Sequence, residues 1–473
     1  MTKKYLALKE LNRRNFLKKT SLSAAALVTA ASLRAEYAST SDERSISSIY
    51  MGDFSAPKLS NIRIAAIGVG ARGPEHLTSV ASLPGTEIVA VSDLYEDLAT
   101  KWADQVTKIG KGERHKKVAT YFGDENEWRT MLKEVKPDVV FIATNWSNHA
   151  PMAIEAMNQG AHAFVEVPLA LTVAEMWQIV DTSERTQKHC MMMENVNYGR
   201  EELMYLNMCR QGVIGELLHG EAAYIHELRF QMEEQDRATG SWRTHQYANR
   251  NGNLYPTHGL GPVAQYMNIG RTEDTFNSLV SYSTPAMGRQ DYAKKNYPAD
   301  HKWNQLTYKG GDMNTSIIKT NLGRTIMVQW DETSPRPYSR LNLIQGTKGC
   351  LAGFPTRVAL EGGVEGATDS HHTWAQGEQL AAIYEKYDHP LYKRMNAVAK
   401  NSGHGGMDGI LDFRIIECLQ QGLPLDQNIY EGCLWSAVGP LSERSVAMGG
   451  APQTFPDFTR GNWKMTQPLN IIE

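Results

Sequence analysis

The sequence contains few cysteines, and their placement argues against two classes of protein. The chain of 473 residues has only five: Cys190, Cys209, Cys350, Cys418 and Cys433. An odd number at wide spacings does not build a disulfide framework. No Cys-x-x-Cys pair offers the clustered thiolates that a structural zinc ion needs. We therefore expect buried free thiols and no metal site.

The chain also lacks a strong net charge and a long apolar run. A formal charge of -3 creates no field that would attract a phosphate backbone or anionic lipid, so we expect no nucleic-acid partner. The apolar run from Ser21 to Leu33 is too short to span a bilayer as a stable helix. We therefore expect no stable membrane span. No internal repeat or low-complexity tract follows this run.

The length of the chain predicts more than one domain. A hydrophobic fraction of 41% and a charged fraction of 21% are typical of a soluble globular enzyme. Because single cores stop growing near about 250 to 300 residues, 473 residues predict two domains behind an N-terminal tail. We divide the sequence into a signal at 1–35, a linker at 36–60, and domains at 61–196 and 197–473.

The N-terminus resembles a twin-arginine export signal. Arg13-Arg14 is followed by Phe16-Leu17-Lys18, a mildly apolar run and Ala35. That route carries folded proteins, which suits a chain that must acquire its cofactor and keep its thiols reduced before export to the periplasm. An ordinary secretion signal is the alternative. Residues Ser39 to Lys58 are rich in Ser, Asp and Gly without an apolar period, which is typical of a linker.

A glycine-rich turn after the first strand predicts a dinucleotide site. The apolar run from Ile62 to Ile67 leads directly into Gly68-Val69-Gly70-Ala71-Arg72-Gly73. Gly68 suits the tight turn, Gly70 the approach of a pyrophosphate, and Gly73 close packing of helix on strand. The second strand ends at Asp93, whose carboxylate would bind ribose hydroxyls and repel a 2'-phosphate. This predicts NAD rather than NADP; a chance glycine turn is the alternative.

Alternation of strands and helices predicts the fold class. Strands at 62–67, 87–91, 139–143, 163–165 and 189–194 alternate with helices at 74–83, 150–159 and 173–187, which favours an α/β fold with an N-terminal doubly wound Rossmann domain. Beyond Gly212, β-rich segments at 221–228, 278–283, 314–320, 325–330 and 340–345 predict an α+β domain with an open, largely antiparallel sheet. One face of that sheet would cover the cofactor. Such a face is also compatible with a homo-oligomer.

Several later segments resemble known families. Val139 to Thr144, Asn148-His149 and Glu166-Val167-Pro168 are similar to the glucose-fructose oxidoreductase, inositol dehydrogenase and MocA superfamily. That superfamily usually carries Glu-Lys-Pro, so Val167 rules out a catalytic lysine there. With Trp146 to His149, Glu194 to Tyr198 and Tyr255-Pro256-Thr257-His258-Gly259, the chain more closely resembles glycoside hydrolase family 109, from Asn61 to about Gly450. Members of that family are NAD-dependent enzymes assigned as alpha-N-acetylgalactosaminidases.

The resemblance implies two sets of site residues. Besides Gly68 and Gly70 of the turn, it implies NAD contacts by Arg72, Gly73, Asp93, Trp146, Ser147, Asn148, His149, Glu166, Val167 and Asn195. It implies sugar contacts by Tyr224, Arg243, Tyr255, Pro256, Thr257, His258 and Tyr338. The candidate catalytic residues are His258, Tyr255, Tyr224, Glu166 and Tyr198.

These residue types suit an unusual route to glycoside cleavage. NAD-dependent glycosidases are an exception to hydrolysis by two carboxylates. Oxidation of the C3 hydroxyl gives a ketone that acidifies the C2 proton; elimination at C1, addition of water and return of the hydride complete the cycle. His258, in a loop rich in Gly and Pro, could take the C3 hydroxyl proton. A tyrosine could take the C2 proton if Arg243 lowers its pKa.

We therefore expect cleavage of terminal alpha-N-acetylgalactosamine from a small molecule or glycan. A periplasmic NAD-dependent sugar dehydrogenase is the main alternative, since fold alone does not exclude it. A sugar-binding protein with a structural NAD is another, but it would leave His258 and the tyrosines unexplained. The pair His371-His372 and the segment at His404 are assigned no role, because histidines in polar loops are usually solvated.

The paired arginines generate a prediction about export. Replacing Arg13 and Arg14 together with lysine should stop export while the protein stays folded and active in the cytoplasm, because the twin-arginine signal is an address that a receptor recognises. Cell fractionation followed by an activity assay would measure this. Unchanged export of the double variant would indicate an ordinary secretion signal.

Overall fold

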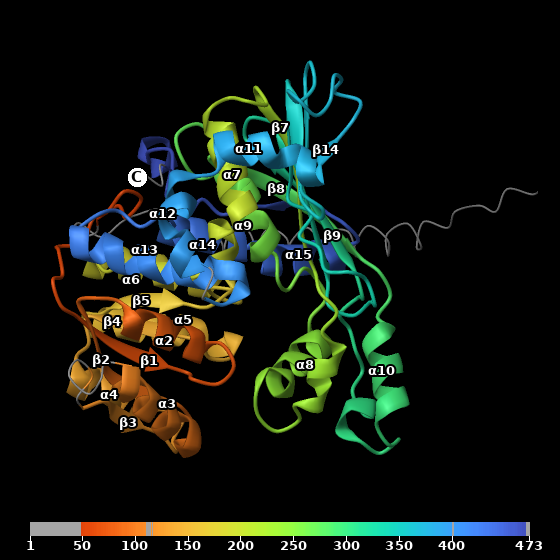
Figure 1. The fold of residues 1–473 in the computed structure, drawn as a ribbon. Helices are drawn as coiled ribbons and strands as arrows, with labels where there is room; N and C mark the ends of the chain where they lie inside the picture. Colours follow the sequence, from red (N-terminus) through yellow and green to blue (C-terminus); the bar gives the residue numbers. More distant parts are fainter. Residues whose placement is uncertain (1–48, 110–114, 116, 400–401, 470–473) are drawn as a thin grey trace, which may run out of the picture. The chain divides into compact units, whose positions relative to one another are not determined.

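The computed structural model describes residues 49–109, 115, 117–399 and 402–469 (Figure 1). The expected export signal and most of the expected linker lie outside these residues. Within the described ranges, no helix combines the length and the apolar character needed to cross a membrane.

The first sheet has the strand order of a dinucleotide-binding fold. Its six strands are all parallel and run in the order β3-β2-β1-β4-β5-β6. Residues of β4 and β5 are buried throughout, as expected for strands covered on both faces. This confirms the predicted Rossmann domain. The strands are β1 (Ile62–Ile67), β2 (Thr86–Ser92), β3 (Ala119–Tyr121), β4 (Val139–Ile142), β5 (His162–Val165) and β6 (Cys190–Met192).

Five helices accompany this sheet, and the sequence prediction missed part of this region. The helices are α2 (Gly73–Ser82), α3 (Glu96–Ile109), α4 (Glu127–Val135), α5 (Trp146–Asn158) and α6 (Val173–Thr186). No element was predicted between Asp93 and Asp138, where α3, β3 and α4 lie. Helix α3 nevertheless carries Leu98, Ala99, Trp102, Ala103 and Val106 at helical spacing, so its apolar period was present in the sequence and was overlooked. Helix α5 was expected to start at Ala150, with Pro151 in its first turn. It starts at Trp146 instead, so Pro151 lies inside the helix.

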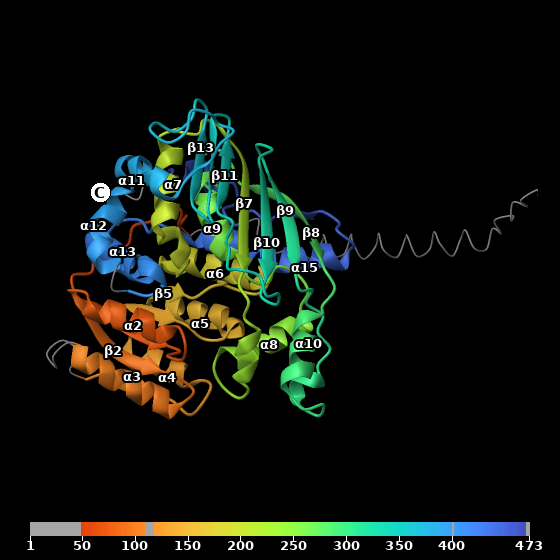
Figure 2. The same cartoon turned by 45° about the vertical axis from the view of Figure 1, so that its right-hand side comes forward.

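The second sheet confirms the predicted open, largely antiparallel architecture. Its order is β14-β13-β12-β11-β7-β10-β9-β8-β15, and only β7 and β10 pair in parallel (Figure 2). Ile317 and Tyr282 stay exposed on its outer face. The strands are β7 (Leu217–Ile225), β8 (Phe276–Ser283), β9 (Asn314–Thr320), β10 (Thr325–Asp331), β11 (Leu343–Gly346), β12 (Gly349–Ala352), β13 (Arg357–Leu360), β14 (Ala375–Gln376) and β15 (Gln453–Thr454).

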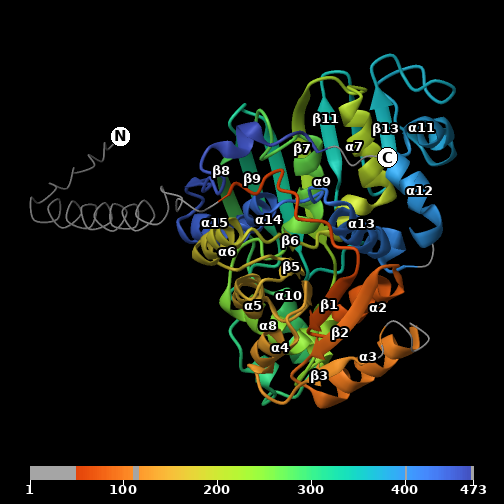
Figure 3. The same cartoon turned by 90° about the vertical axis from the view of Figure 1, so that its left-hand side faces the viewer.

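Helices of the C-terminal part cover the inner face of this sheet and also reach the Rossmann helices. Helix α9 packs on β7, α15 packs on β8, and α13 packs on α2 (Figure 3). All helices of the C-terminal part, including α8 and α10 of the lobe described next, are α7 (Arg200–Arg210), α8 (Thr239–Asn249), α9 (Thr257–Tyr266), α10 (Gly288–Asn296), α11 (Ala381–Tyr387), α12 (Pro390–Ala399), α13 (Met407–Gln421), α14 (Ile429–Ser436) and α15 (Val438–Ala447). A short 3-10 helix, η1 (Asn195–Tyr198), joins the Rossmann part to α7.

A small lobe around α8 and α10 has its own core. Trp303 is fully buried there with Met232, Ala248, Ala293 and Tyr308. Figures 1 and 2 show α8 and α10 beyond the ends of the strands, beside the Rossmann helices. Arg237 of this lobe lies over the Tyr95 ring at 4.0 Å and pairs with Asp97 at 3.1 Å. The lobe therefore contacts the Rossmann domain just after Asp93.

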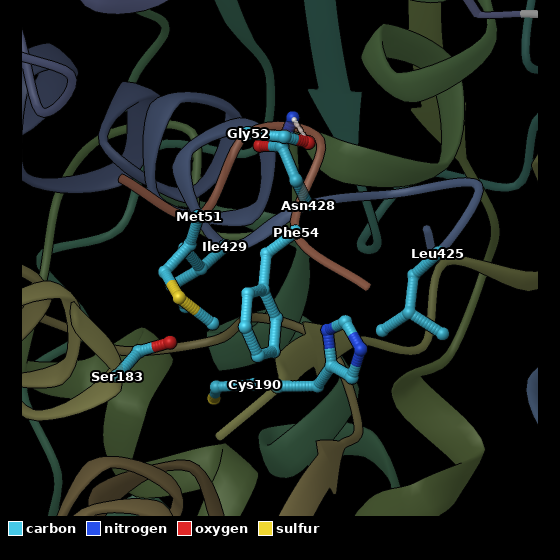
Figure 4. Close-up of a pocket in the computed structure, with 9 residues that line it drawn as sticks. Met51, Gly52, Phe54, Ser183, Cys190, Leu425, Asn428 and Ile429 are labelled. Atoms are coloured by element: carbon cyan, nitrogen blue, oxygen red, sulfur yellow. Dashed lines mark hydrogen bonds between the residues drawn. The ribbon is translucent and has the colours of Figure 1, made fainter. Parts of the chain in front are cut away.

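The described part of the expected linker, residues 49–60, packs against the folded chain. Residues 49–60 were placed in the linker, but Met51 and Ala56 are buried. The Met51 amide donates to the Tyr430 hydroxyl at 3.0 Å, and the Leu59 amide donates to the Leu419 carbonyl at 3.0 Å. Figure 4 shows Phe54 beside Cys190 and Leu425 in a small cavity. This cavity lies near the amino end of β6, at the opposite edge of the sheet from the glycine turn.

Two glycines allow α9 to lie between the two sheets. A Cβ on Gly259 would overlap the backbone of Ala223 in β7. A Cβ on Gly261 would lie 3.0 Å from Glu194 Cγ and 2.9 Å from Asn197 Oδ1, beyond the end of β6. Helix α9 therefore lies directly on the backbone of β7 on one side and on the side chains of Glu194 and Asn197 on the other.

Gly259→Ala tests this close approach. The added methyl must push α9 away from β7, so we expect a loss of about 1–3 kcal/mol in unfolding free energy, the usual cost of overpacking. Thermal and urea denaturation would measure it. Gly439→Ala in α15 is the control, because its Cβ would meet only the Asn253 carbonyl oxygen at 3.6 Å. Equal stability of the two variants would contradict this account.

Candidate active site

The predicted site residues gather at the carboxyl edge of the parallel sheet. Gly68 follows β1, Asp93 follows β2, Trp146 lies just beyond β4, Glu166 follows β5 and Glu194 lies just beyond β6. Ligands of open α/β sheets bind at this edge. Residues far apart in the sequence are therefore brought together in the place where a dinucleotide would bind.

The glycine turn has the shape that a pyrophosphate needs. Gly68 has a φ of 84°, and a Cβ on Gly73 would overlap the Gly68 carbonyl, so the fold itself requires both glycines. Gly70 differs, since a Cβ there would meet nothing within 4 Å. The space above Gly70 stays open for the approach of a ligand. Asp93 accepts hydrogen bonds from the amides of Val69 at 2.8 Å and Tyr95 at 3.0 Å, which hold its carboxylate beside the turn.

Glu166 is the centre of a buried charge network. One of its oxygens accepts from Arg72 Nε at 3.0 Å and from His76 Nε2 at 3.0 Å. The other nitrogen of His76, Nδ1, donates to Asp412 of α13 at 2.8 Å. Burial opposes the charge on His76, but the carboxylates of Asp412 and Glu166 outweigh it and raise the His76 pKa to about 10. Burial would raise the pKa of Glu166, yet Arg72 and His76 hold it well below its usual value.

A second carboxylate, Asp408 of α13, continues this network. It accepts from Asn195 Nδ2 at 2.7 Å and from His404 Nδ1 at 2.7 Å, and it pairs with Arg72 at 3.2 Å. Burial would raise the pKa of Asp408, but His404 and Arg72 hold it well below its usual value. Glu75 also pairs with Arg72. His404, to which the sequence assigned no role, thus belongs to the group that holds Arg72 in place.

The loop after β4 is fixed by His149. Its Nδ1 lies 2.7 Å from the Pro168 carbonyl, and its Nε2 lies 3.2 Å from the Thr144 carbonyl, so the ring joins the loops that follow β4 and β5. Burial lowers the His149 pKa, and the two carbonyls oppose that shift. Ser147 is exposed and Asn148 half-buried in the first turn of α5, while Val167 is buried.

His258 pairs with a carboxylate that sequence analysis did not assign to the site. Its Nδ1 lies 2.6 Å from Glu194 Oε1, and the Glu194 side chain is fully buried. His258 is the second residue of α9 and not part of a loop, which corrects the expectation from its Gly and Pro neighbours. The helix starts there because Pro256 stands at its N-cap, where the missing amide costs nothing. A proton on Nδ1 towards Glu194 leaves Nε2 as the acceptor.

An aromatic cluster surrounds His258. Tyr224 of β7 stacks on Tyr255 with ring centroids 4.7 Å apart, and the His258 ring meets Tyr224 at 5.1 Å and Tyr255 at 4.9 Å. Trp146 from the Rossmann edge meets Tyr255 at 5.9 Å. The rings thus connect the nucleotide edge with the second sheet. The Tyr224 hydroxyl hydrogen-bonds to His226 Nδ1 at 2.9 Å.

Arg243 lies against this cluster and is backed by a buried acid. Its guanidinium carbon is 5.0 Å from the centre of the Trp146 ring and 5.4 Å from that of Tyr255. Glu332, fully buried, lies 4.0 Å away and accepts a hydrogen bond from the Tyr247 hydroxyl. Burial raises the Glu332 pKa to about 7, while Arg243 opposes that shift. The Arg243 side chain is itself largely buried against these rings.

Burial changes the expected chemistry of the tyrosines. The sequence suggested that Arg243 would lower a tyrosine pKa. Burial instead raises the Tyr224 pKa well above its usual value, helped by Tyr255 and Glu332 and opposed by Arg243. Burial also raises the Tyr255 pKa, against the effect of Arg243. Neither phenol is ionised at rest.

The remaining predicted sugar contacts lie near the cluster, with one exception. Pro256 and Thr257 are buried between Tyr255 and His258, and Tyr338 is exposed with its ring 6.3 Å from that of Tyr224. Tyr198 points elsewhere: its hydroxyl donates to Asp426 at 3.1 Å in a fully buried position. The geometry gives Tyr198 a structural partner and does not bring it to His258.

Several residues of the site were not predicted from the sequence. They are Glu194, His226, Glu332, His76, Asp408 and Asp412. Glu194 could have been found, because it follows a parallel strand just as Glu166 does. Asp408 and Asp412 carried no local signal, since they reach the site only through the packing of α13 on α2, whereas His226 lies two residues after Tyr224 in the chain.

Comparison with known proteins identifies the family. Residues 198–465 match the model for the glycosyl hydrolase 109 C-terminal domain, which is more than half of the chain. The chain belongs to glycoside hydrolase family 109. Two family 109 proteins from Akkermansia muciniphila are 61% and 55% identical to it, covering 90% and 98% of this chain and 87% and 99% of their own. A family 109 protein from Shewanella baltica is 54% identical, covering 98% of this chain and 99% of its own.

The N-terminal part of this family 109 chain matches a nucleotide-binding family. Residues 62–194 match the model for the oxidoreductase family with an NAD-binding Rossmann fold. Solved structures share the fold at low identity. A levoglucosan dehydrogenase in complex with NADH aligns at a TM-score of 0.60 with 17% identity, covering 84% of this chain and all of its own. An NAD-binding oxidoreductase from Klebsiella pneumoniae aligns at 0.63 with 16% identity, covering 84% and 99%. The cofactor is NAD, as the glycine turn and Asp93 predicted.

Gly70→Ala separates cofactor binding from folding. Because the new methyl meets no protein atom within 4 Å, we expect an unchanged melting temperature. It would occupy the space that the pyrophosphate approaches, so we expect purified wild-type protein to carry NAD and the variant to lose it. Denaturing both proteins and assaying the supernatants for nucleotide would measure this. Full NAD content in the variant, or NADP in the wild type, would contradict the assignment.

Proposed function

We propose that this family 109 enzyme releases terminal alpha-N-acetylgalactosamine by an NAD-dependent cycle of oxidation, elimination, addition and reduction. The family and the NAD-binding domain support an NAD-dependent glycosidase or oxidoreductase. The observation that carries the finer proposal is the pairing of His258 with Glu194 beside two stacked tyrosines, at the edge where the cofactor binds.

The polar groups of the nucleotide site fit the cofactor. Several of its buried polar atoms have no hydrogen-bond partner among the described residues, including Asn195 Oδ1 and Glu194 Oε2. Together with the open space above Gly70 and the carboxylate of Asp93, they suit a polar ligand. When bound, NAD would accept a hydride from C3 of the sugar and return it at the end of the cycle.

His258 would remove the proton from the C3 hydroxyl. A general base must lie within hydrogen-bond reach of its proton and have a free acceptor atom. Glu194 fixes the His258 ring through Nδ1 and would stabilise the imidazolium that forms, as a buried carboxylate does for a catalytic histidine in hydrolases. Nε2 is then the atom that takes the proton.

One of the stacked tyrosines would exchange the proton at C2. The C3 ketone makes this proton acidic, and Tyr224 and Tyr255 lie within ring contact of His258. Arg243 would stabilise the negative charge that develops on the enolate or hold the acetamido group.

Hydrolysis by a pair of carboxylates is not favoured by the same residues. Each buried glutamate of the site already has a partner: Glu166 binds Arg72 and His76, Glu194 binds His258, and Glu332 binds Tyr247. A sugar dehydrogenase on the same fold remains the second candidate, supported only by fold similarity to dehydrogenases. The two candidates differ in whether reduced cofactor accumulates.

Cleavage of an alpha-N-acetylgalactosaminide in heavy water tests the cycle. Because elimination requires loss of the C2 proton, the released sugar should carry deuterium at C2, with no net NADH. Mass spectrometry or NMR would detect it. His258→Ala should lower turnover about 100-fold to 10,000-fold, the usual contribution of a general base, while bound NAD is retained.

Two results would contradict the proposal. A released sugar without deuterium at C2 would exclude elimination. Accumulation of NADH with an intact glycosidic bond would instead establish a dehydrogenase.

A further inference from the structure

Tyr224 cannot act as a base without a group that receives its own proton. Its phenol is buried and its pKa is raised, so the resting residue carries a proton. To take a proton from carbon, it must release that proton as the new one arrives. The stacked ring of Tyr255 faces the same difficulty, because burial raises its pKa as well.

His226 stands at the position where that proton would go. Tyr224 and His226 lie on one side of the chain at the end of β7, two residues apart, and the Tyr224 hydroxyl is 2.9 Å from His226 Nδ1. Since a phenol hydroxyl donates, Nδ1 accepts in this bond. Burial lowers the His226 pKa, and the neighbouring His258 and Arg243 lower it further, whereas Glu227 opposes them. His226 is therefore neutral and able to accept a proton.

The surroundings of His226 connect the site to solvent. The His226 ring is half-buried and meets the ring of Tyr338 edge-on at 4.9 Å, and Tyr338 is 40% exposed. Tyr224, by contrast, is 7% exposed. The order Tyr224, His226, Tyr338 thus leads from the buried stack beside His258 to the surface of the protein.

We infer that Tyr224 exchanges the C2 proton of the sugar and that His226 relays this proton between Tyr224 and solvent. The inference rests on the proposed function. As the C2–H bond breaks, its proton passes to the Tyr224 oxygen, and the Tyr224 hydroxyl proton passes to His226 Nδ1. The electron pair of the C2–H bond forms the C1–C2 double bond, and the C1 substituent leaves with its own bonding pair and takes up a proton from water. Return of the proton after water has added reverses the transfer.

The cations around the relay suit a reversible transfer. A proton on His226 lies near His258 and Arg243, so it is held weakly and is readily given back to Tyr224 or to water. His226 does not contact the sugar in this scheme; it acts through Tyr224. A purely structural role would require only that position 226 accepts the Tyr224 hydrogen bond.

His226→Asn separates these two roles. The asparagine amide can accept the Tyr224 hydrogen bond but cannot take up a proton. With wild-type NAD content and melting temperature as the check on folding, we expect turnover of an aryl alpha-N-acetylgalactosaminide to fall about 100-fold to 10,000-fold. C3 oxidation depends on His258, so enzyme-bound NADH should rise during turnover. A substrate deuterated at C2 should show a larger isotope effect than with wild type.

His219→Asn is the matched control, because His219 lies on the same strand and its Nδ1 also meets a hydroxyl, that of Thr325 at 2.8 Å, away from the aromatic cluster. It should leave bound NADH and the C2 isotope effect unchanged. If His226→Asn matches wild type in bound NADH, C2 isotope effect and deuterium uptake, His226 is structural and the relay is wrong. If wild type itself releases no sugar, or releases it without deuterium at C2, the proposed function fails and the relay fails with it.

Discussion

The site depends on the direct contact between helix α9 and strand β7. At Gly259 the helix lies on the backbone of Ala223 with no side chain between them, and at Gly261 it lies on Glu194. This double contact places His258 beside Tyr224 from the second sheet and within 2.6 Å of the Glu194 carboxylate from the first. A close-packed interior transmits such a constraint, because neighbouring groups have little space to adjust.

The carboxyl edge of the parallel sheet and the aromatic cluster around His258 are stabilised by different means. At the cofactor edge, buried charges are each paired more than once: Glu166 meets Arg72 and His76, and Asp408 meets Arg72 and Asn195. A buried charge that loses its partner destabilises the folded state strongly, so the network favours a single arrangement of α13 on α2. At the aromatic cluster around His258, neutral rings pack on one another, and their burial raises the pKa values of Tyr224 and Tyr255 against the effect of Arg243. The proton transfers that we propose there use histidine partners, His258 and His226.

The small lobe around α8 and α10 joins these two regions. It supplies Arg243 to the aromatic cluster, and it contacts the Rossmann domain through Arg237, Tyr95 and Asp97, next to Asp93. An exposed ion pair contributes little to stability by itself. The position of the lobe matters more than this ion pair, since one lobe with its own core reaches both the nucleotide edge and the aromatic cluster.

The sequence by itself determined the nucleotide half of this protein. Gly68, Gly73 and Asp93 are close in the chain, and their roles follow from the local backbone of a strand, a turn and a helix. The motif around His258 also indicated the family. Only the tertiary structure decided that Glu194 is the partner of His258, because these two residues become neighbours through packing between elements. His226 lies two residues after Tyr224, but only the structure shows that its Nδ1 meets the Tyr224 hydroxyl. Burial, a property of the whole fold, then reversed the expected direction of the tyrosine pKa values.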